Sequence, residues 1–462
     1  MVKKLLFDKY HVSNHGLNWG AKGEFSVKVN PPTKSDGPFL VREKPWESKG
    51  VNWATLHIED GIWRLWYESF DNNAKNDMSS YLCYAESRDG KTWVKPELGI
   101  IEYNGSKANN IVIDRNVTQG LGLHGSCVFK DPTSSPEARW RIVFLGEHPD
   151  HYGRQWPVMC YGYSPDGLHW TAGAPEMPID FNHYPTQNFG SDTQCVVRWD
   201  NRLRRYVGYF RTWEPNGSRS IARSETSDLT SWPMPKPIIR PDFYEDFQVD
   251  YYNSAASKVE TMGDTAHYIF YSVFNHTTEK LKVCLATSRD GIHYDRYDRT
   301  PYLANDRDFD SGSIYVSPGI HEVDEDTQCI IYNGSSKTHA EDEVQYSISK
   351  KPRGGLCMAT FPRDRLQGLD TKTAFEFCVM GKVDPMNPEV VLNADIRGRV
   401  RAALIDKEGN FIPGFTAEDC TPVTGDSLRH VIAWPGGKTD IREADLRLYA
   451  EDATLYSVTV NR

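Results

Sequence analysis

The sequence predicts an all-β protein, a five-bladed β-propeller followed by a small β-sandwich. Three observations lead to this fold class. A short motif of β-like residues, a Ser, an Asp turn and an aromatic residue recurs along the chain, and helical periodicity is absent from nearly all of it. The pattern then changes near residue 372, after which short strands continue without the motif. A chain of 462 residues has room for a large all-β domain and a second small one.

The repeated motif sets the number of blades. Clear copies occupy residues 84–93, 161–170, 222–232 and 286–294, and a degenerate fifth copy occupies residues 344–349. The aromatic residues that close the clear copies are Trp93, Trp170, Trp232 and Tyr294. Their spacing matches one four-stranded blade with generous loops per repeat. Five blades therefore extend over about residues 40–370.

The chemistry of this motif is structural. Asp accepts backbone hydrogen bonds within the turn, and Gly, present in three copies, supplies a positive φ. We expect the aromatic residue to fill space beside the neighbouring strands of its blade. The motif therefore predicts the fold and indicates little about catalysis.

The predicted division is a propeller over residues 1–371, including the N-terminal segment, and a β-sandwich over residues 372–462. Short strands such as residues 389–393, 400–405 and 446–450 support the second domain. We expect this sandwich to pack against the propeller as a structural support, and a carbohydrate-binding role is the alternative.

Composition excludes several classes of partner. The formal net charge is −10 with no basic run, which argues against binding to nucleic acid or to an anionic membrane. The nine cysteines form no CxxC pair, so we expect reduced thiols in the core and no zinc site. The first eight residues do not resemble a signal peptide, and no apolar run is long enough to span a bilayer. These features predict a cytoplasmic protein, with an export signal removed before this sequence begins as the alternative.

Taken together, the repeats and the C-terminal strands resemble a known family. Copies of Ser-x-Asp-Gly-x-x-Trp followed by a β-sandwich are similar to the five-bladed propeller glycoside hydrolases, especially the family 32 levanases and invertases, and the family 43 propeller is similar. The likeness rests on residues 45–47, 82–90, 95–99 and 109–111. It implies the propeller fold and a glycosidase-like activity.

The catalytic sequence motifs of family 32 are absent from the matching blades of this chain. Trp-Met-Asn-Asp-Pro-Asn-Gly, Arg-Asp-Pro and Glu-Cys are absent from the matching blades, and the nearest approach, residues 129–132, has the composition of a hairpin turn. The resemblance therefore implies fold and reaction class, and it assigns no catalytic residue.

Candidate catalytic residues follow from the architecture instead. The innermost strands of a propeller line its central channel, and ligands bind in the funnel where these strands begin. Glycoside hydrolysis needs two carboxyl groups, one to protonate the leaving oxygen and one to attack or to activate water. The carboxylates that lie just before the predicted inner strands are Glu47, Asp192, Asp250 and Asp310. We predict Asp192 and Asp250 as the catalytic pair, with Glu47 as the third candidate.

Other polar and aromatic residues, at these strand starts or in loops that could reach the funnel, are predicted to bind substrate. They are Trp46, Asn52, His124, Arg211, Tyr251, Asp310 and His339. Trp53 and Trp213 are further rings on which a sugar could stack. For each of these residues a structural role in a core, a cap or an ion pair is the alternative.

The predicted function is a glycosidase, exo-acting on a short oligosaccharide. Two alternatives stay open: an oligosaccharide lyase that uses His124, Tyr251 and Arg211 in the same funnel, and a noncatalytic carbohydrate-binding propeller. No cofactor and no catalytic metal are predicted, and a structural cation in the channel is left open. The sequence does not indicate the sugar, the linkage or the oligomeric state.

Overall fold

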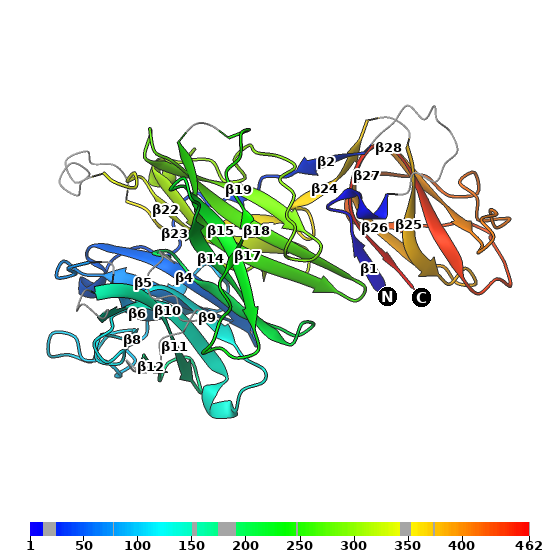
Figure 1. The fold of residues 1–462 in the computed structure, drawn as a ribbon. Helices are drawn as coiled ribbons and strands as arrows, with labels where there is room; N and C mark the ends of the chain where they lie inside the picture. The colour runs from blue at the N-terminus through cyan, green and yellow to red at the C-terminus, as the bar shows by residue number, and fades with distance from the viewer. Residues whose placement is uncertain are drawn as a thin grey trace.

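The computed structural model describes residues 1–12, 25–76, 78–149, 155–173, 191–245, 248–341, 353–372 and 375–461. Within these ranges nearly all regular structure is β-strand, and the helical elements are short 3₁₀ turns. Figure 1 shows two bodies side by side, one formed by β4 to β23 and a smaller one that contains β1, β2 and β24 to β28. The predicted fold class, an all-β propeller followed by a smaller β-domain, is confirmed.

The strands of the larger body fall into five successive antiparallel units. Unit 1 contains β4 (Gly50–Glu59), β5 (Ile62–Phe70), β6 (Tyr81–Ser87), β7 (Trp93–Val94) and β8 (Ile111–Ile113). Unit 2 contains β9 (His124–Lys130), β10 (Trp140–Pro149), β11 (Gln155–Ser164) and β12 (Thr171–Ala172). Unit 3 contains β13 (Val196–Asp200), β14 (Arg205–Trp213), β15 (Arg219–Thr226) and β16 (Lys236–Ile239).

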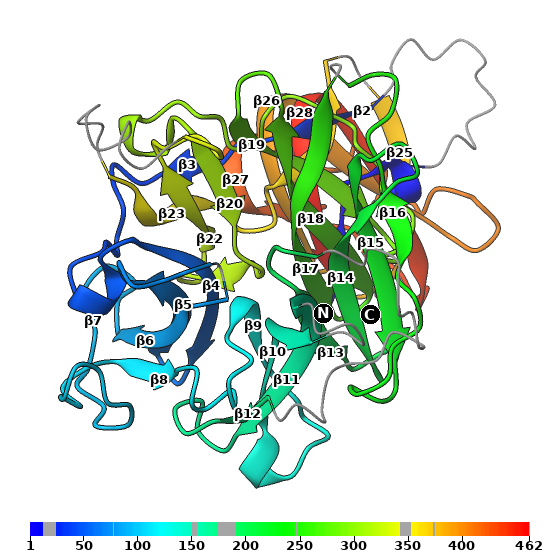
Figure 2. The ribbon, with the colours of Figure 1, turned by 60° about the vertical axis from the view of Figure 1, so that its left-hand side comes forward.

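Units 4 and 5 are joined in one hydrogen-bonded sheet by a single parallel pairing, Leu281 opposite Ser313. Unit 4 contains β17 (Val249–Thr261), β18 (Asp264–Asn275) and β19 (Lys280–Ser288). Unit 5 contains β20 (Ser313–Val316), β21 (His321–Glu322), β22 (Thr327–Ser335), β23 (Gly355–Pro362) and the N-terminal strand β3 (Thr33–Lys34). Figure 2 shows the units following one another around a common centre.

The apolar cores of the propeller lie between units. Within the described residues, one buried cluster joins units 1 and 2, another joins units 2 and 3, a third joins units 3 and 4, and a fourth joins units 4 and 5. A fifth cluster packs Trp63 and Tyr67 of unit 1 with Ile331 and Leu356 of unit 5, which closes the ring. Burial between neighbouring sheets is the main favourable contribution to such an assembly.

An N-terminal strand completes unit 5. Lys34 and Thr33 of β3 pair with Ala359 and Thr360 of β23, so residues that precede unit 1 in the chain supply the outer strand of the last unit. The Lys34 ammonium is buried and donates to Asp310 Oδ2 at 2.6 Å and to the Ala304 carbonyl at 2.5 Å. The two ends of the propeller segment are therefore held in one sheet.

The repeated turns have the predicted chemistry. Ser87 Oγ accepts from the Gly90 N–H at 2.9 Å, and Asp89 Oδ1 accepts from the backbone N–H groups of Lys91 and Thr92 at 2.8 and 2.7 Å. Equivalent contacts occur in the turns at Ser164, Asp166 and Gly167 and at Ser288, Asp290 and Gly291. Side chains thus satisfy the backbone donors of each turn, as the motif predicts.

The aromatic residues of the motif fold back over their own turns. In each of three copies the Trp Nε1–H donates to the carbonyl oxygen three residues earlier, in the pairs Trp93 to Gly90, Trp170 to Gly167 and Trp232 to Leu229. Tyr294 is partly buried and packs against the cluster between units 3 and 4. The degenerate copy at residues 344–349 lies outside the described residues.

The smaller body is a seven-stranded antiparallel sheet in the described part of the chain. Its strands are β1 (Val2–Leu5), β2 (Ser26–Val29), β24 (Gln367–Thr371), β25 (Phe375–Val383), β26 (Val390–Ile405), β27 (Val423–Ile432) and β28 (Ala444–Val460). β28 pairs with β26 along one edge and with β25, β24 and β1 along the other. This sheet encloses an apolar cluster of its own.

The N-terminal segment belongs to both bodies. β1, β2 and β24 fall within residues 1–371, yet they pair inside the C-terminal sheet, so the predicted boundary between residues 371 and 372 cuts through that sheet. Phe7 packs in the cluster between units 4 and 5, and its carbonyl accepts from Gln367 Nε2 at 2.5 Å. The guanidinium of Arg289, from the motif of unit 4, lies 4.0 Å from the Phe7 ring centroid and pairs with Asp8.

The described cysteines are buried free thiols, in line with the prediction of reduced core residues. Among the described helices none is long and apolar enough to cross a membrane. The described His, Cys, Asp and Glu side chains include no group of three or more placed to hold a metal ion.

Gly167 offers a direct test of the repeated turn. It has φ +79°, and a Cβ there would lie 2.6 Å from Cζ2 of the buried Trp66, whereas Gly217, with φ +84°, faces open space. We expect Gly217→Ala to lower the free energy of unfolding by about 1–2 kcal/mol because of its left-handed backbone. Gly167→Ala should cost about 1–3 kcal/mol more, since it also overpacks the core. Urea denaturation of the two variants measures the difference, and equal losses would contradict it.

We expect His267 to cause part of the pH dependence of the free energy of unfolding. Burial, with Arg198 and Lys258 nearby, lowers its pKa to about 3, so the folded protein keeps it neutral where the unfolded chain protonates it. Above about pH 6.5 this residue therefore leaves the free energy of unfolding at its full value. As the pH falls from about 6.5 toward 3, protonation of the unfolded chain lowers the free energy of unfolding by about 1.4 kcal/mol per pH unit. We expect His267→Gln to reduce this slope between pH 4 and 6 in urea titrations. An unchanged slope would show that His267 is protonated in the folded state.

Candidate functional site

Buried amide side chains connect the inner strands β4, β9, β13, β17 and β20 near their starts. Gln194 Nε2 donates to the carbonyls of Ala54 and Ser126, at 3.0 and 2.8 Å, and so joins units 1 and 2 to unit 3. Asn253 Nδ2 donates to the Val316 carbonyl at 2.9 Å, which joins units 4 and 5. We call the region around these strand starts the funnel.

Two carboxylates of adjacent units lie at the funnel, each paired with an arginine. Asp192 precedes β13, and its side chain is 49% exposed while it forms a salt bridge with Arg211 of β14. Asp250, in β17, is almost fully buried, with its side chain 4% exposed, and accepts from Arg219 Nη1 at 2.6 Å. Charge-assisted contacts of this kind fix the orientation of both carboxylates.

The two arginines lie over the same pair of rings. The Arg211 Cζ is 5.5 Å from the Trp213 ring centroid and 5.0 Å from that of Tyr252. For Arg219 the same distances are 4.6 and 5.4 Å. Because both guanidinium groups contact both rings, Asp192 and Asp250 belong to one cluster. We call the set Asp192, Arg211, Trp213, Arg219, Asp250 and Tyr252 the arginine–aromatic cluster.

Histidines extend this cluster. His276 Nε2 lies 3.0 Å from Asp250 Oδ2, and its side chain is 41% exposed, so the dyad connects a buried carboxylate to solvent. His339 stacks edge-on against Tyr252 at 4.8 Å, and its Nδ1 lies 3.0 Å from the Tyr315 hydroxyl. Burial, reinforced by the Arg219 charge, lowers the pKa of His339 below its ordinary value. The imidazole of His339 is therefore neutral near pH 7.

Units 1 and 2 together contribute a second corner of the funnel. His124 Nε2 faces the Asp192 carbonyl at 3.2 Å, and His124 Nδ1 lies 3.4 Å from Oε2 of the fully buried Glu68. Glu68 Oε1 also accepts from the Ser126 N–H at 2.6 Å. The Trp53 ring lies edge-on to His124, at a centroid distance of 6.0 Å.

Trp53 marks an irregularity in β4. Pairing with β5 shifts register between Asn52 and Ala54, and Trp53 has φ +31°. The Trp53 Nε1–H and the Asn52 Oδ1 are buried and form no hydrogen bond with the described residues. A bulge with a strained residue and unsatisfied polar atoms is typical of ligand-binding positions.

The structure places four of the predicted residues in contacts away from this cluster. Trp46 Nε1 donates to Asn110 Oδ1 at 2.9 Å inside unit 1. The Tyr251 ring is fully buried between units 3 and 4, and its hydroxyl donates to Glu245 Oε1 at 2.5 Å. Glu47 and Asp310, discussed next, are fully buried. The predicted members that do meet at the funnel are Asn52, His124, Asp192, Arg211, Asp250 and His339.

Glu47 and Asp310 share one structural arrangement. Glu47 ends the 3₁₀ turn η2 (Pro45–Glu47), caps it by accepting from the N–H of Lys44, and pairs with Lys95 Nζ at 2.8 Å and the Tyr67 hydroxyl at 2.6 Å. Asp310 ends η4 (Asp308–Asp310), caps it likewise, and contacts Lys34 and the Tyr332 hydroxyl. Both carboxylates are directed back into their own units, so we do not include them in the catalytic proposal below.

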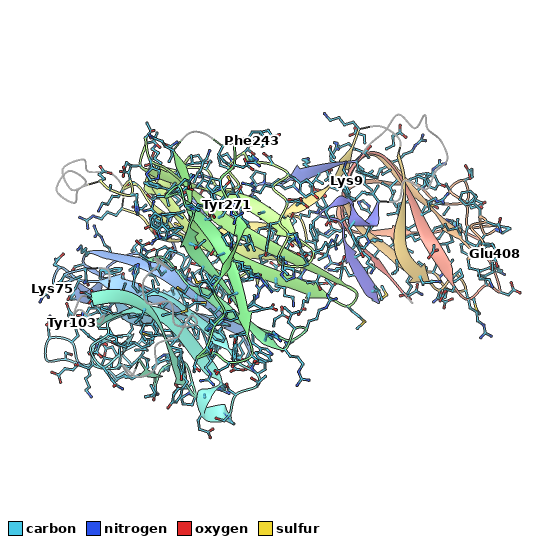
Figure 3. All side chains as sticks on the ribbon, viewed as in Figure 1. Lys9, Lys75, Tyr103, Phe243, Tyr271 and Glu408 are labelled. Atoms are coloured by element: carbon cyan, nitrogen blue, oxygen red, sulfur yellow. The ribbon has the colours of Figure 1, made fainter. Side chains whose placement is uncertain are left out.

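Sequence reasoning missed Glu68, Arg219, His276 and Tyr315. Glu68 carries a usable signal, because it is a charged residue inside β5, where the five preceding positions are mostly buried. The other three stand at strand ends whose register the sequence does not reveal. Two exposed aromatic residues, Phe243 and Tyr244, precede β17 and have no contact with this cluster among the described residues; Figure 3 labels Phe243 on the larger body.

Comparison with known proteins bears on the fold. No family model matches the chain, and no curated protein matches its sequence. A solved structure described as a glycoside hydrolase aligns with a TM-score of 0.50 at 13% identity, over 72% of this chain and 92% of that protein. By fold, the chain resembles a glycoside hydrolase. The catalytic domain of an alpha-L-arabinofuranosidase from Coprinopsis cinerea aligns with a TM-score of 0.46 at 13% identity, over 73% of this chain and 98% of that domain.

This likeness covers the propeller architecture and transfers no residue role at such low identity. The narrower resemblance to family 32 stays a prediction, and so do the individual site residues. The arginine–aromatic cluster and its histidines are features of this chain, derived from its own contacts.

Glu47 can be tested as a structural carboxylate. Glu47→Gln leaves the buried Lys95 ammonium without its main partner, and we expect the free energy of unfolding to fall by about 3–5 kcal/mol. The matched control is Glu59→Gln, which removes the partner of Lys130 in a pair whose side chains are 40% and 36% exposed and should cost about 1 kcal/mol or less. Urea denaturation measures both. Equal, small losses would show that Glu47 is not needed for folding and would return it to the catalytic candidates.

Proposed function

We propose that this protein is a glycosidase that cleaves a glycosidic bond of a short oligosaccharide in the funnel. The observation that carries the proposal is the arginine–aromatic cluster, which brings Asp192 and Asp250 from adjacent units into one set of contacts. The fold likeness to a glycoside hydrolase supports it. Glycoside hydrolysis uses two carboxyl groups on opposite sides of the scissile bond.

The carboxylates of Asp192 and Asp250 differ in how far they are exposed to solvent. Asp192 is half exposed, so it can meet a sugar directly, and we assign it the attacking or water-activating role. Asp250 is covered by Arg219 and His276, and its contact with the partly exposed His276 gives a route for a proton between the carboxylate and the funnel. Trp213 and Tyr252 offer ring faces beside the carboxylates, and aromatic faces suit the apolar side of a sugar ring.

A second function, an oligosaccharide lyase, is favoured by a specific contact. Tyr315 and His339 are hydrogen bonded at 3.0 Å, and Tyr252 packs against both rings. A neutral His and a Tyr hydroxyl can move a proton next to arginines that neutralise a carboxylate. This version replaces the His124, Tyr251 and Arg211 set of the sequence prediction with His339, Tyr315 and Arg211, because Tyr251 is buried in the core.

Products distinguish these functions. The protein should be screened against nitrophenyl glycosides and against plant and algal oligosaccharides, with reducing sugar and ultraviolet absorbance measured together. On the oligosaccharides, a glycosidase releases reducing ends without new ultraviolet absorbance, whereas a lyase releases reducing ends together with an unsaturated uronate that absorbs in the ultraviolet. Saturable sugar binding with neither product would instead support the noncatalytic binding propeller.

Asp192 is the residue to replace once a substrate is found. Asp192→Asn keeps the size of the side chain but removes its charge, so we expect kcat to fall by about 100-fold or more. The melting temperature should fall too, because the buried Arg211 loses the charge of its partner. Asp250→Asn should lower kcat as well and should also destabilise the protein, because Arg219 then loses its buried partner.

The matched control is Asp395→Asn. Asp395 is 34% exposed and pairs with Arg397 in the C-terminal sheet, so its loss removes the same kind of contact far from the funnel in sequence and fold. It should leave kcat unchanged. Normal turnover in both Asp192→Asn and Asp250→Asn would overturn the assignment of this pair.

A further inference from the structure

A small cavity lies where units 1 and 5 meet. It has a volume of about 90 Å³ and is bounded by the start of β4, the end of β22 and the start of β23. This is several times the space that one ordered water needs, so the cavity can hold several waters or a small anion. Asn333 Nδ2 donates to the Val51 carbonyl at 2.5 Å and holds the two units together beside it.

Positive charge surrounds this cavity. The side chains that line it include Arg42, Lys49, Lys337 and Arg353, and no acidic side chain of the described residues lines it. The chain as a whole carries a formal net charge of −10, so this concentration of cations runs against the overall composition. A concave site with one sign of charge attracts ions of the opposite sign.

Arg42 is fixed in place at the cavity. Its Nη1 donates to the carbonyls of Ser48 and Lys49, at 3.0 and 2.8 Å, just before β4 begins. No described carboxylate pairs with Arg42, Lys49 or Arg353. A guanidinium held by backbone contacts with further N–H donors is suited to a planar or tetrahedral oxyanion.

Glycines form much of the remaining wall. A Cβ at Gly354 would lie 1.7 Å from the Gly334 carbonyl oxygen, and one at Gly355 would lie 2.4 Å from the Leu40 carbonyl oxygen. Only glycine permits this close approach of the strands. The cavity is therefore a feature of the backbone with cationic side chains around it, and it does not result from a missing core residue.

The cavity adjoins the funnel along the chain. Gly50 and Val51, which line it, directly precede Asn52 and Trp53 at the bulge of β4. Lys337 lies two residues before His339, which packs against Tyr252 of the arginine–aromatic cluster. The cavity and the funnel therefore share β4 and the segment that follows β22.

We propose that Arg42, Lys49 and Arg353 form a binding site for an oxyanion, a carboxylate, sulfate or phosphate group, at the rim of the funnel. Two sources share this chemistry: an acidic group carried by the sugar, or a free inorganic ion. The site itself does not depend on the proposed glycosidase activity, whereas the sugar-borne source rests on it.

Binding of defined anions tests the site without requiring turnover. Sulfate, inorganic phosphate, glucuronate and a uronate-containing trisaccharide should be titrated calorimetrically at constant ionic strength, with glucose and a neutral trisaccharide as uncharged comparisons. We expect saturable binding of at least one anion. In the double variant Lys49→Gln/Arg353→Gln its dissociation constant should rise about tenfold or more, since each charged contact is worth about 1.5–3 kcal/mol.

The matched control is Arg88→Gln/Lys91→Gln, which removes one Arg and one Lys from an exposed turn of the same unit and gives the same change in net charge. It should bind anions like the wild type. Tighter binding of the acidic trisaccharide than of the inorganic ions identifies a sugar-borne group, and the reverse order identifies a free ion. Both orders support the site.

Two outcomes would overturn the proposal: no saturable anion binding, or an equal dissociation constant in the wild type and the Lys49→Gln/Arg353→Gln variant. The same titration on Asp192→Asn separates this result from the proposed function, because that variant should lose turnover but keep the oxyanion site. Loss of anion binding with normal glycosidase activity in Lys49→Gln/Arg353→Gln would confirm a site that is independent of catalysis.

Discussion

The buried ion pair between Lys34 and Asp310 closes the propeller ring. β3 is only two residues long, so its backbone pairing with β23 is a weak attachment by itself. The Lys34 ammonium extends that attachment, because it reaches the capped turn η4 before β20 and lies 5.9 Å from the Tyr332 ring centroid on β22. Units 1 and 5 also share an apolar cluster, so the ion pair and this cluster hold the same two units together.

Unit 1, which follows unit 5 around the ring, contains the same kind of ion pair. There Lys95, Glu47 and Tyr67 form the equivalent contacts. These two lysine-bound carboxylates differ from the arginine-bound pair at the funnel. Glu47 and Asp310 accept from a lysine, a tyrosine and the backbone of a 3₁₀ turn within their own units and are completely buried. Asp192, by contrast, is half exposed and contacts an arginine that also lies over two rings. The type of partner thus separates the two structural carboxylates from the two candidate catalytic ones, and exposure sets Asp192 apart from the other three.

Local contacts could be predicted from the sequence, whereas contacts between distant residues could not. The motif turns and the strands that lead to them were predictable because their hydrogen bonds join residues within a few positions, as between Ser87, Asp89 and Gly90. Asp192 and Asp250 were predicted from their place before inner strands, and the structure brings them into one cluster. The same rule also selected Glu47, but a carboxylate before a strand can equally turn back to cap the preceding residues, as Glu47 does in η2. Glu68 was missed because it lies inside a strand, where only the partner strand reveals which way it faces.

Charge balance gives the funnel and the neighbouring cavity different chemical preferences. In the arginine–aromatic cluster two carboxylates face two guanidinium groups, so the set is neutral overall and presents fixed dipoles and ring faces, which suit the hydroxyls and apolar faces of a sugar. The cavity at the start of β4 has cations without acidic side chains among the described lining residues. A ligand with one acidic group would therefore have a single favourable orientation, with its charge in the cavity and its neutral part over the cluster. The bulge at Trp53 directly follows Gly50 and Val51 of the cavity, and its ring contacts His124 and Tyr315, so β4 contributes to both environments.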